Sequence, residues 1–490
     1  MRSLTIERAA FIIIFALLFA LATRIPIDTD TWWHIRSGEH TLTQGMIHAD
    51  LFSFTMRGEP WINHSWGAQV VMYAFWQVAG NLGLAVFTSL LATGGMYMVY
   101  RMSAGNVYLR GFALVIGAAT AAVFWSPRPQ MFSFFLSAVV LYLLYQYKRE
   151  KVDRLWLIPV VMLLWVNLHA GFSIGFILMA GMIGGEVLAN LFNPQGADVI
   201  RRGRLRKLII VAVISVVVLV INPYGLQIYS VPLQTVSIGA LQDYIQEWNS
   251  PNFHERQTWP FVALLLSVFG AVGASRRRLD WSDFALVSGT AFMALMAGRN
   301  IALFAVVATP VLTNHLQSML EERGWVLQTI KRPTRRMAQL NAVLVVLVLV
   351  GSLAKVLLVL DTETVAEGQA MFLPVAATDY FKANDLTGPM FNSYNWGGYL
   401  IFNLPDEPVF VDGRTDLYGN DLLQTYLNTA VGGEGWRETL DEYDIRLVFV
   451  EAQSGLARQL RDEPGWVLDY EDDLAVIFTR EAIDGEATGG

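Results

Sequence analysis

The chain of 490 residues has no cysteine, which excludes disulfide bonds, thiolate catalysis and cysteine-ligated metal sites. It is also poor in charge, since only 16% of its residues are charged, whereas a typical soluble domain has about 25%. It contains no internal repeat. In contrast, hydrophobic residues make up 54% of the chain and the mean hydropathy is +0.41. This balance predicts a polytopic α-helical membrane protein.

Long apolar runs account for most of the hydrophobic residues. A helix crosses the ~30 Å hydrocarbon core of a bilayer with about 20 apolar residues, and on this measure the sequence predicts about 11 transmembrane helices. They lie near residues 7–25, 80–100, 109–125, 131–147, 155–169, 171–192, 207–222, 259–275, 282–297, 300–317 and 340–360. Residues 65–79 could add a short span or an interfacial helix. The first run is too long for a signal peptide and no small-residue cleavage site follows it, so we expect it to be retained.

Four basic clusters predict the orientation, because Lys and Arg accumulate in cytoplasmic loops. The clusters are Lys148–Arg154, Arg201–Lys207, Arg276–Arg278 and Lys331–Arg336. If the N-terminus is cytoplasmic and the spans number eleven, all four clusters face the cytoplasm. The segments on the outer side are then residues 26–64, 223–258 and 361–490. We therefore expect a multi-pass protein of the plasma (inner) membrane whose C-terminal region is extracytoplasmic.

The C-terminal region differs from the rest in charge and in pattern. From Asp361 onward there are 25 acidic and 7 basic residues, a net charge of −18, while the first 360 residues carry +11. Short β-like runs alternate there with amphipathic helical segments, which is typical of a small α/β domain with a partly parallel sheet. The expected strands are Met390–Tyr394, Pro408–Val411, Arg446–Glu451, Trp466–Tyr470 and Leu474–Thr479. The sequence thus predicts a membrane domain over residues 1–360 and an extracytoplasmic α/β domain over residues 361–490.

The first predicted outer segment is the richest in chemical groups. It contains Asp28 and Asp30, then His34, Asp50 and His64. Paired carboxylates can act as a general base or bind a divalent cation such as Mg²⁺ or Mn²⁺, so Asp28 and Asp30 are candidate catalytic and metal-binding residues. Asp is also frequent in loops because it forms turns, and both histidines could be structural. The tryptophans of this segment could stack on sugars, although anchoring at the membrane interface is their commoner role.

Further ionisable residues are expected at the outer ends of spans or in outer loops. They are Arg128, His169, Glu247 and Arg299. Charges at membrane depth are expensive and are functional candidates by default. Arg299 could bind a lipid phosphate or form a structural pair with Glu247 or Asp28. The same two roles are open for Arg128.

These motifs, in this order, resemble the GT-C superfamily of membrane glycosyltransferases, in which an Asp-containing outer loop follows the first span. An outer soluble domain often follows the last span in that superfamily. The resemblance rests on the phrases Asp28-Thr-Asp30-Thr-Trp32-Trp33-His34-Ile, Trp61-Ile-Asn63-His64, Asn167-Leu-His169-Ala-Gly171, Asn222-Pro-Tyr-Gly225 and Glu247-Trp248. They are similar to those of a bacterial branch described as dolichyl-phosphate-mannose-type or oligosaccharyltransferase-like. The resemblance covers most of the membrane part and implies a GT-C fold.

A second motif lies near the start of the α/β domain. Tyr394-Asn-Trp396-Gly-Gly-Tyr precedes Asp412-Gly-Arg414, and it looks similar to the Trp-Trp-Asp-Tyr-Gly signature with which oligosaccharyltransferase catalytic subunits bind acceptor peptide. Asn395 stands where that signature has Asp, and Trp396 alters the spacing, so peptide binding is not carried over. The resemblance instead implies that the domain is a lid or acceptor platform. The candidate residues of that platform are Tyr394, Trp396, Asp412 and Arg414.

By resemblance, the protein would transfer a sugar from a polyprenyl-phosphate donor, with inversion, to a glycan, lipid or protein acceptor on the outer face. Asp28 would be the general base, with Asp30 as the second choice, and Arg299 would bind the leaving phosphate. His34 and Asp50 would position the substrate or bind the metal. The other candidates for contact with substrate or lipid phosphate are His64, Arg128, His169 and Glu247. Membrane lipids would be further partners, and no nucleic acid is expected.

Two other functions are open on the sequence. The altered Trp-Gly-Gly-Tyr motif and the acidic outer domain also fit a non-catalytic membrane scaffold of GT-C origin that binds a protein partner. A transporter is disfavoured, because the apolar spans hold few charges and the two halves of the chain do not repeat.

Overall fold

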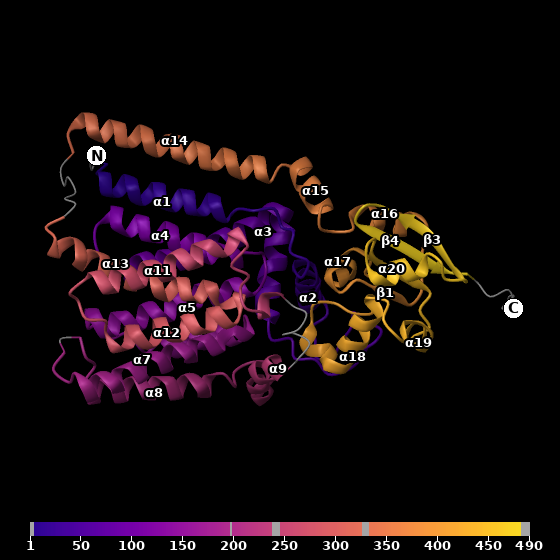
Figure 1. Ribbon diagram of the computed structural model, residues 1–490, viewed down its shortest axis with the longest axis horizontal. Coiled ribbons are helices and arrows are strands. Elements are labelled where there is room, and N and C mark those ends of the chain that lie inside the picture. The colour runs from indigo at the N-terminus through magenta and orange to yellow at the C-terminus, as the bar shows by residue number, and fades with distance from the viewer. Residues whose placement is uncertain (1–3, 197, 238–245, 326–332, 482–490) are drawn as a thin grey trace. The chain divides into compact units, whose positions relative to one another are not determined.

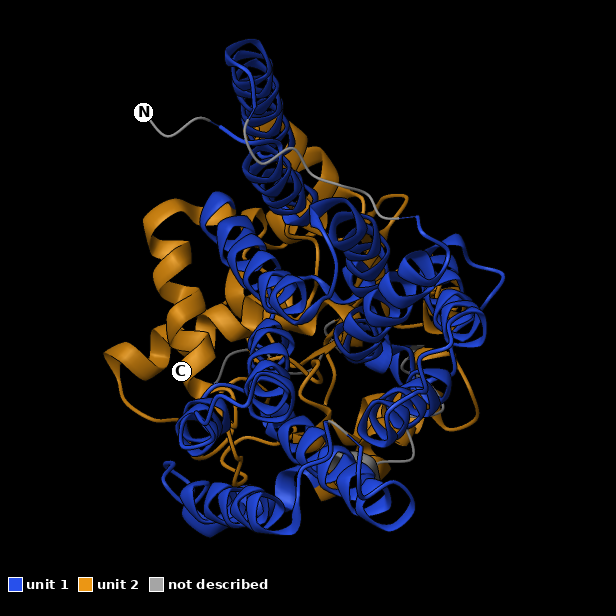
Figure 2. Ribbon diagram, turned by 90° about the vertical axis from the view of Figure 1, so that its left-hand side faces the viewer, with its two compact units in different colours: residues 1–24, 82–232, 245–360 blue, residues 25–81, 233–244, 361–490 orange. Residues whose placement is uncertain are grey.

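The chain forms two compact units. The computed structural model (Figure 1) describes residues 4–196, 198–237, 246–325 and 333–481. Figure 2 colours the two units, which are Met1–Arg24, Leu82–Pro232 and Ile245–Leu360 for unit 1, and Ile25–Asn81, Leu233–Tyr244 and Asp361–Gly490 for unit 2. The first predicted outer segment therefore belongs to the same unit as the C-terminal domain. The basic cluster at 331–336 and the outer segment at 223–258 lie partly outside the described residues.

Unit 1 is a bundle of helices in its described part. The longer helices are α1 (Ile6–Ala22), α4 (Val107–Ala121), α5 (Gln130–Tyr145), α6 (Leu157–Val166), α7 (Ser173–Phe192), α8 (Arg202–Val218), α11 (Trp259–Ala274), α12 (Trp281–Met296), α13 (Ile301–Glu322) and α14 (Arg335–Val359). Short helices between them are η1 (Ala122–Phe124), η2 (Gln146–Glu150), η3 (Ala170–Phe172), η4 (Gly225–Ser230), η5 (Gln246–Trp248), η6 (Arg256–Thr258) and η7 (Gly298–Asn300). The short helix α9 (Val231–Ser237) begins in unit 1 and continues into unit 2. Among the long helices, α1 packs on α14, α4 on α13, and α7 on α12 (Figure 1).

The helix α3 (Trp66–Met102) begins in unit 2 and ends in unit 1. Its backbone is non-helical at Ala79 and Gly80, and the φ of Gly80 is 52°. Glycine suits this position because it lacks the Cβ that disfavours a positive φ. The predicted run at 80–100 forms the second part of this helix, and residues 65–79 form most of the first part.

By length and composition, seven of the described helical segments could cross a membrane. They are Trp66–Met102, Val107–Phe124, Gln130–Glu150, Ala170–Phe192, Arg256–Ala274, Gly298–Glu322 and Arg335–Val359, with α6 and α12 as shorter apolar helices. The protein is therefore a multi-pass integral membrane protein. The count of about 11 spans stays a prediction, since α1 and α8 have only 17 residues each. The orientation of the termini also stays a prediction.

Charged side chains in the interior of unit 1 are paired with one another. Lys148 in η2 is buried and forms ion pairs with Glu186 and Asp280, and Arg149 pairs with Asp283 at 2.6 Å. An unpaired charge inside a membrane bundle is costly. Glu186 of α7, Asp280 just before α12 and Asp283 within α12 therefore allow the two basic side chains to be buried. Two members of the predicted cytoplasmic cluster are thus held by the bundle itself.

Unit 2 combines the first outer segment with an α/β domain. Its helices besides the start of α3 are α2 (Thr31–Thr43), α15 (Thr362–Ala370), α16 (Val375–Ala383), α17 (Tyr394–Asn403), α18 (Thr415–Ala430), α19 (Trp436–Glu442) and α20 (Gly455–Leu460). Its strands are β1 (Met390–Asn392), β2 (Leu447–Glu451), β3 (Trp466–Glu471) and β4 (Ala475–Arg480). The predicted small α/β domain is confirmed.

The sheet has the order β1-β2-β4-β3, with β1 parallel to β2 and the other neighbours antiparallel. β2 is central and its residues from Leu447 to Val450 are buried, as expected for a strand covered on both faces. The predicted strand at Pro408–Val411 is not a strand in the structure. Instead Val409 forms isolated bridges with Met390 of β1 and with Ser53 of the first outer segment. Backbone hydrogen bonds between the two segments, Phe54 N to Val409 O and Val409 N to Phe52 O, build the outer segment into this domain.

Candidate functional site

Asp28 and Asp30 lie in the loop before α2, and both are half-buried. Asp28 Oδ1 accepts a hydrogen bond from the backbone N of Asp30 at 3.1 Å, which closes a local turn of the kind that Asp favours. Asp30 Oδ1 accepts one from the indole Nε1 of Trp33 at 3.2 Å, one helical turn further along. The loop is thus ordered by its own side chains.

Glycines of the C-terminal domain contact this loop. A Cβ atom on Gly413 would lie 1.9 Å from Asp30 Oδ1, and one on Gly398 would lie 2.7 Å from the carbonyl oxygen of Thr29. A Cβ on the neighbouring Gly397 would lie 2.1 Å from the carbonyl oxygen of Val411. Because real Cβ atoms do not approach so closely, only glycine allows α17 and the residue-413 backbone to pack here. In the glycine pair of the predicted platform motif, Gly398 therefore allows close packing against the loop, and Gly397 allows close packing against the backbone of Val411 and Asp412.

The two tryptophans that follow Asp30 lie in the protein interior. Trp32 is 3% exposed and Trp33 is 6% exposed. The ring of Trp32 packs edge-on against Tyr399 of α17 at 5.6 Å between centroids and also contacts Phe402 at 5.4 Å. The expectation of sugar stacking or interfacial anchoring is wrong for these two residues, since both rings are buried. Aromatic side chains of α17 cover Trp32, and Trp33 packs against the rings of His34 and Trp61.

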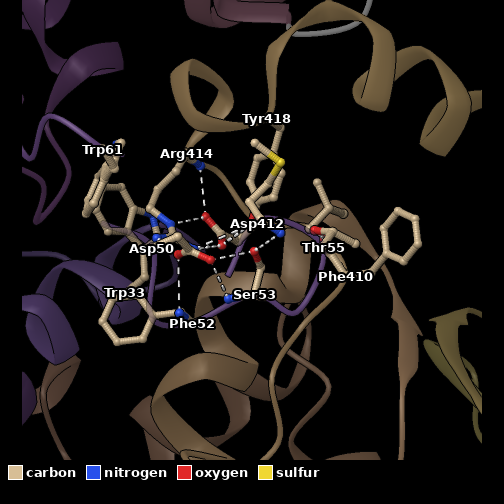
Figure 3. Close-up of polar contacts among 12 residues, drawn as sticks. Trp33, Asp50, Phe52, Ser53, Thr55, Trp61, Phe410, Asp412, Arg414 and Tyr418 are labelled. Carbon is tan, nitrogen blue, oxygen red and sulfur yellow. Dashed lines mark hydrogen bonds and ion pairs between the residues drawn. The ribbon is translucent and has the colours of Figure 1, made fainter. Parts of the chain in front are cut away.

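A buried ion cluster joins the first outer segment to the C-terminal domain (Figure 3). Arg414 donates from Nε and Nη2 to the two carboxylate oxygens of Asp412, at 2.8 and 2.6 Å, and from Nη1 to Asp50 Oδ1. The hydroxyl of Tyr418 donates to Asp412 Oδ2, and the hydroxyl of Ser53 donates to Asp50 Oδ2 at 2.6 Å. All three charged side chains have no exposed surface. The guanidinium is therefore clamped between two carboxylates.

Aromatic rings and electrostatics complete this cluster. The Arg414 guanidinium lies 5.0 Å from the ring centroid of Trp61 and 5.1 Å from that of Phe52, within the range of cation–π attraction. Burial alone would raise the pKa of Asp50, but attraction to Arg414 and hydrogen bonds from Ser53 outweigh it, so this pKa lies below its ordinary value. Burial and the nearby Asp412 charge raise the pKa of Tyr418. Asp50 is consequently ionised and Tyr418 neutral at neutral pH.

The four expected platform residues have different surroundings. Trp396 is 2% exposed and donates from Nε1 to the carbonyl oxygen of Phe372 at 3.2 Å. Asp412 and Arg414 are occupied by the ion cluster, so these three side chains contact the interior of the domain. Tyr394 is half-buried, and its backbone N donates to the hydroxyl of Tyr426.

The two candidate histidines of the first outer segment have separate partners. His34 is 5% exposed, and its Nδ1 lies 3.2 Å from Gln69 Nε2. His64 Nδ1 lies 2.9 Å from the hydroxyl of Ser65. Burial lowers the pKa of His64, although the carboxylate of Asp416 opposes the shift. The imidazole of His64 is therefore neutral near pH 7.

In unit 1 the structure brings Arg128, Glu247 and Arg299 together. Glu247 lies 3.6 Å from Arg128 Nη1 through Oε2 and 3.9 Å from Arg299 Nη1 through Oε1. The Arg299 guanidinium also lies 4.0 Å from the ring centroid of Trp248. The three charged side chains are 23%, 34% and 27% exposed. Of the roles considered for Arg299, the pair with Glu247 is thus present, and Arg128 shares the same carboxylate.

His169 lies elsewhere in unit 1, before the short helix η3. Its Nδ1 accepts a hydrogen bond from the backbone N of Gly171 at 3.0 Å and lies 2.7 Å from the hydroxyl of Ser133. The indole of Trp165 donates to the same hydroxyl at 2.8 Å. These contacts cap η3 and join it to α5 and α6.

A divalent cation was expected at Asp28 and Asp30. Among the described residues, no group of three or more His, Asp or Glu side chains is arranged to hold a metal ion. Mg²⁺, however, is often bound by one or two carboxylates together with substrate phosphates and water. Asp28 and Asp30 are compatible with that second kind of site, in which the substrate supplies ligands.

Sequence reasoning missed the partners of Asp50 and Arg414. Ser53 follows Asp50 by three residues, a spacing at which Asp accepts from nearby backbone and hydroxyl groups. Tyr418 follows Arg414 by four residues, a spacing at which side chains meet when the segment is helical, and here Arg414 directly precedes α18. Both spacings were visible in the sequence, whereas the pairing across 364 residues was not.

Comparison with solved structures identifies the fold of the chain. No protein-family model matches the chain, and no curated protein sequence matches it. The archaeal oligosaccharyltransferase AglB from Archaeoglobus fulgidus, in complex with an inhibitory peptide and a dolichol-phosphate, is similar with a TM-score of 0.56 at 11% identity, over 91% of this chain and 69% of that chain. The oligosaccharyltransferase of the same organism in the apo form has a TM-score of 0.52 at 12% identity, over 91% and 70%. ArnT from Cupriavidus metallidurans bound to undecaprenyl phosphate has a TM-score of 0.49 at 13% identity, over 96% of each chain. At these identities the two oligosaccharyltransferase structures establish the fold alone.

Proposed function

We propose that this chain, which has the fold of the GT-C membrane glycosyltransferases, transfers a sugar from a polyprenyl-phosphate donor to an acceptor. The reaction takes place on the extracytoplasmic face of the plasma membrane, in the orientation that the basic clusters favour. The acceptor is a glycan, a lipid or a protein.

The observation that carries the proposal is the group formed by Arg128, Glu247 and Arg299. The guanidiniums of Arg128 and Arg299 lie 3.6 and 3.9 Å from the same carboxylate, that of Glu247, and all three side chains are partly exposed. Arg128 lies two residues before the start of α5, and Arg299 two residues before the start of α13. Helix N-termini favour anions, and guanidiniums bind phosphate with charge-assisted hydrogen bonds. A lipid phosphate fits this chemistry, and the AglB structure is in complex with a dolichol-phosphate.

We assign the proton transfer to the loop of Asp28 and Asp30. The acceptor hydroxyl gives its proton to the Asp28 carboxylate while its oxygen attacks the anomeric carbon of the sugar. The bond from that carbon to the phosphate oxygen breaks, and the electron pair leaves with the polyprenyl phosphate. The attack is in line, so the configuration inverts and no covalent intermediate forms. Asp30 is the second candidate for the base.

The arginines have a separate role in the proposed reaction. As the bond to phosphate breaks, negative charge grows on the leaving oxygen, and Arg299 with Arg128 stabilises it. Before the phosphate binds, the negative charge of Glu247 reduces the repulsion between the two guanidiniums. A divalent cation bound through Asp28 and Asp30 would supply further charge neutralisation when present.

The proposal is tested by incubating the purified protein in lipid nanodiscs with a panel of radiolabelled polyprenyl-phosphate sugars. Release of free polyprenyl phosphate, dependent on the protein, is the expected result. If no donor is consumed and a stoichiometric protein partner is instead recovered with the chain, the non-catalytic scaffold is the better description.

A further inference from the structure

We propose that Gly413 is a positioning residue for the carboxylate of Asp30, so that the C-terminal domain sets the geometry of the proposed catalytic loop. The effect on turnover rests on the proposed function. The contact between the two residues does not, because both belong to unit 2.

The contact is close, and the three atoms nearest to a Cβ at residue 413 all belong to Asp30. A Cβ atom on Gly413 would lie 1.9 Å from Asp30 Oδ1, 2.8 Å from Cγ and 3.3 Å from Oδ2. The backbone of Gly413 lies outside the left-handed region, so alanine could adopt its conformation without strain. What glycine provides here is space for a carboxylate, and not backbone freedom.

Both neighbours of Gly413 in the chain are fixed. Asp412 and Arg414 are buried in the ion cluster, and the backbone N of Arg414 donates to Asp412 Oδ1 at 2.9 Å. A Cβ on Gly397 of α17 would lie 2.7 Å from the Asp412 Cα, so this helix packs closely against the backbone next to Gly413. The backbone at residue 413 is therefore held in place, and the Asp30 side chain packs directly against it.

A hydrogen bond from Trp33 also holds the Asp30 carboxylate. Trp33 donates from Nε1 to Asp30 Oδ1 at 3.2 Å, and the Trp33 ring is itself buried. The same Oδ1 atom thus meets the indole and the Gly413 backbone, which together define its position. A methyl group at residue 413 must displace this atom by more than 1 Å to reach ordinary contact, and a displacement of about 1 Å can lower a rate on the order of 100-fold.

The experiment compares Gly413→Ala with Gly289→Ala in the full-length protein. Gly289 of α12 is exposed and has open space around its Cα, so its substitution controls for the change from glycine to alanine. We expect Gly413→Ala to lower kcat on the order of 100-fold, with little change in the KM for the lipid donor, and Gly289→Ala to leave both unchanged. A Gly413→Ala variant that keeps the wild-type kcat while the wild type is active overturns the inference and leaves the proposed function intact.

A second experiment tests the contact between Gly413 and Asp30 through protein stability and does not require enzymatic activity. Gly413→Ala is combined with Asp30→Ala, and the midpoint of thermal unfolding is measured for the wild type, both single variants and the double variant. We expect Gly413→Ala to lower the midpoint when Asp30 is present and to have little effect when residue 30 is alanine. If Gly413→Ala shifts the midpoint equally with Asp30 and with alanine at residue 30, the inference is overturned, even if the protein is inactive. If the shift depends on Asp30 but the wild type is inactive, the result counts against the proposed function alone.

Discussion

Arg414 of the C-terminal domain donates a hydrogen bond to Asp50 of the first outer segment, although the two residues are 364 positions apart in the chain. Neither side chain has exposed surface. Because both charges are out of water, removal of one partner leaves the other uncompensated, which typically costs about 3–5 kcal/mol. The stability of the C-terminal domain therefore depends on the segment that carries Asp28 and Asp30.

Replacement of Arg414 by methionine should lower the free energy of unfolding by about 3–5 kcal/mol, because two buried carboxylates would lose their shared cation. Denaturant or thermal unfolding of the purified protein in detergent measures this. Arg461→Met is the matched control, since Arg461 pairs with Glu471 on the surface and an exposed pair contributes only about 0–1 kcal/mol. Similar losses in the two variants would show that the buried cluster has no special role in stability.

The stability of the protein should fall at acid pH in a way that depends on Asp50. Its pKa is lower in the folded protein than in the unfolded chain, where it is about 3.9. The stabilisation is therefore fully present above about pH 5 and is lost as the pH falls through the folded pKa, below about pH 4. The midpoint of thermal unfolding between pH 7 and pH 3 should fall more steeply for the wild type than for Asp50→Asn. Parallel pH profiles would contradict the assignment.

Substitution of Arg299 should weaken the binding of polyprenyl phosphate. A charge-assisted hydrogen bond contributes about 1.5–3 kcal/mol, so Arg299→Ala should raise the Kd about 10- to 100-fold. Glu247→Gln should lower the Kd, since it removes the anion that competes with the phosphate for both guanidiniums. Binding can be measured by titration of the lipid into the protein in nanodiscs.

The control for the arginine variants is Arg278→Ala, because Arg278 is exposed in the loop between α11 and α12. The Arg278→Ala variant should bind the lipid with the same affinity as the wild type. Loss of binding in Arg278→Ala to the same extent as in Arg299→Ala would point to a general electrostatic effect and not to a phosphate site.

The absence of native cysteine makes the orientation directly testable. Asp462→Cys in the C-terminal domain and Arg278→Cys in the α11–α12 loop both place a thiol at an exposed position. In cells whose outer permeability barrier has been opened, a membrane-impermeant maleimide should label only Asp462→Cys. Arg278→Cys should react only after the plasma membrane is permeabilised, and the reverse pattern would require the opposite orientation.

Local patterns predicted the elements of this protein well. Apolar runs of sufficient length became α4, α5, α7 and α13, and the β-like runs became β1 to β4, because helix and strand formation follows from nearby residues. Pro408–Val411 was predicted as a strand on the same grounds. It forms only bridges, since its partners are Ser53, which is distant in the chain, and Met390 of β1.

The surroundings of the candidate residues could not be predicted in the same way. The pairing of Arg414 with Asp50, and the packing of Gly413 against Asp30, depend on a tertiary contact between segments separated by more than 300 residues. The burial of Trp32 under α17 has the same origin. A single sequence shows which groups are available, but not which of them the fold places together.

Turnover of a polyprenyl-phosphate sugar by the wild type and by the Asp28→Asn, Asp30→Asn double variant is the most direct test of the proposed transferase. General-base catalysis contributes about 10²- to 10⁴-fold, so the double variant should release polyprenyl phosphate at least about 100-fold more slowly. The exposed pair Asp462→Asn, Asp473→Asn is the matched control and should retain wild-type turnover. Unchanged release by the Asp28→Asn, Asp30→Asn variant would contradict the assignment of this loop as the catalytic one.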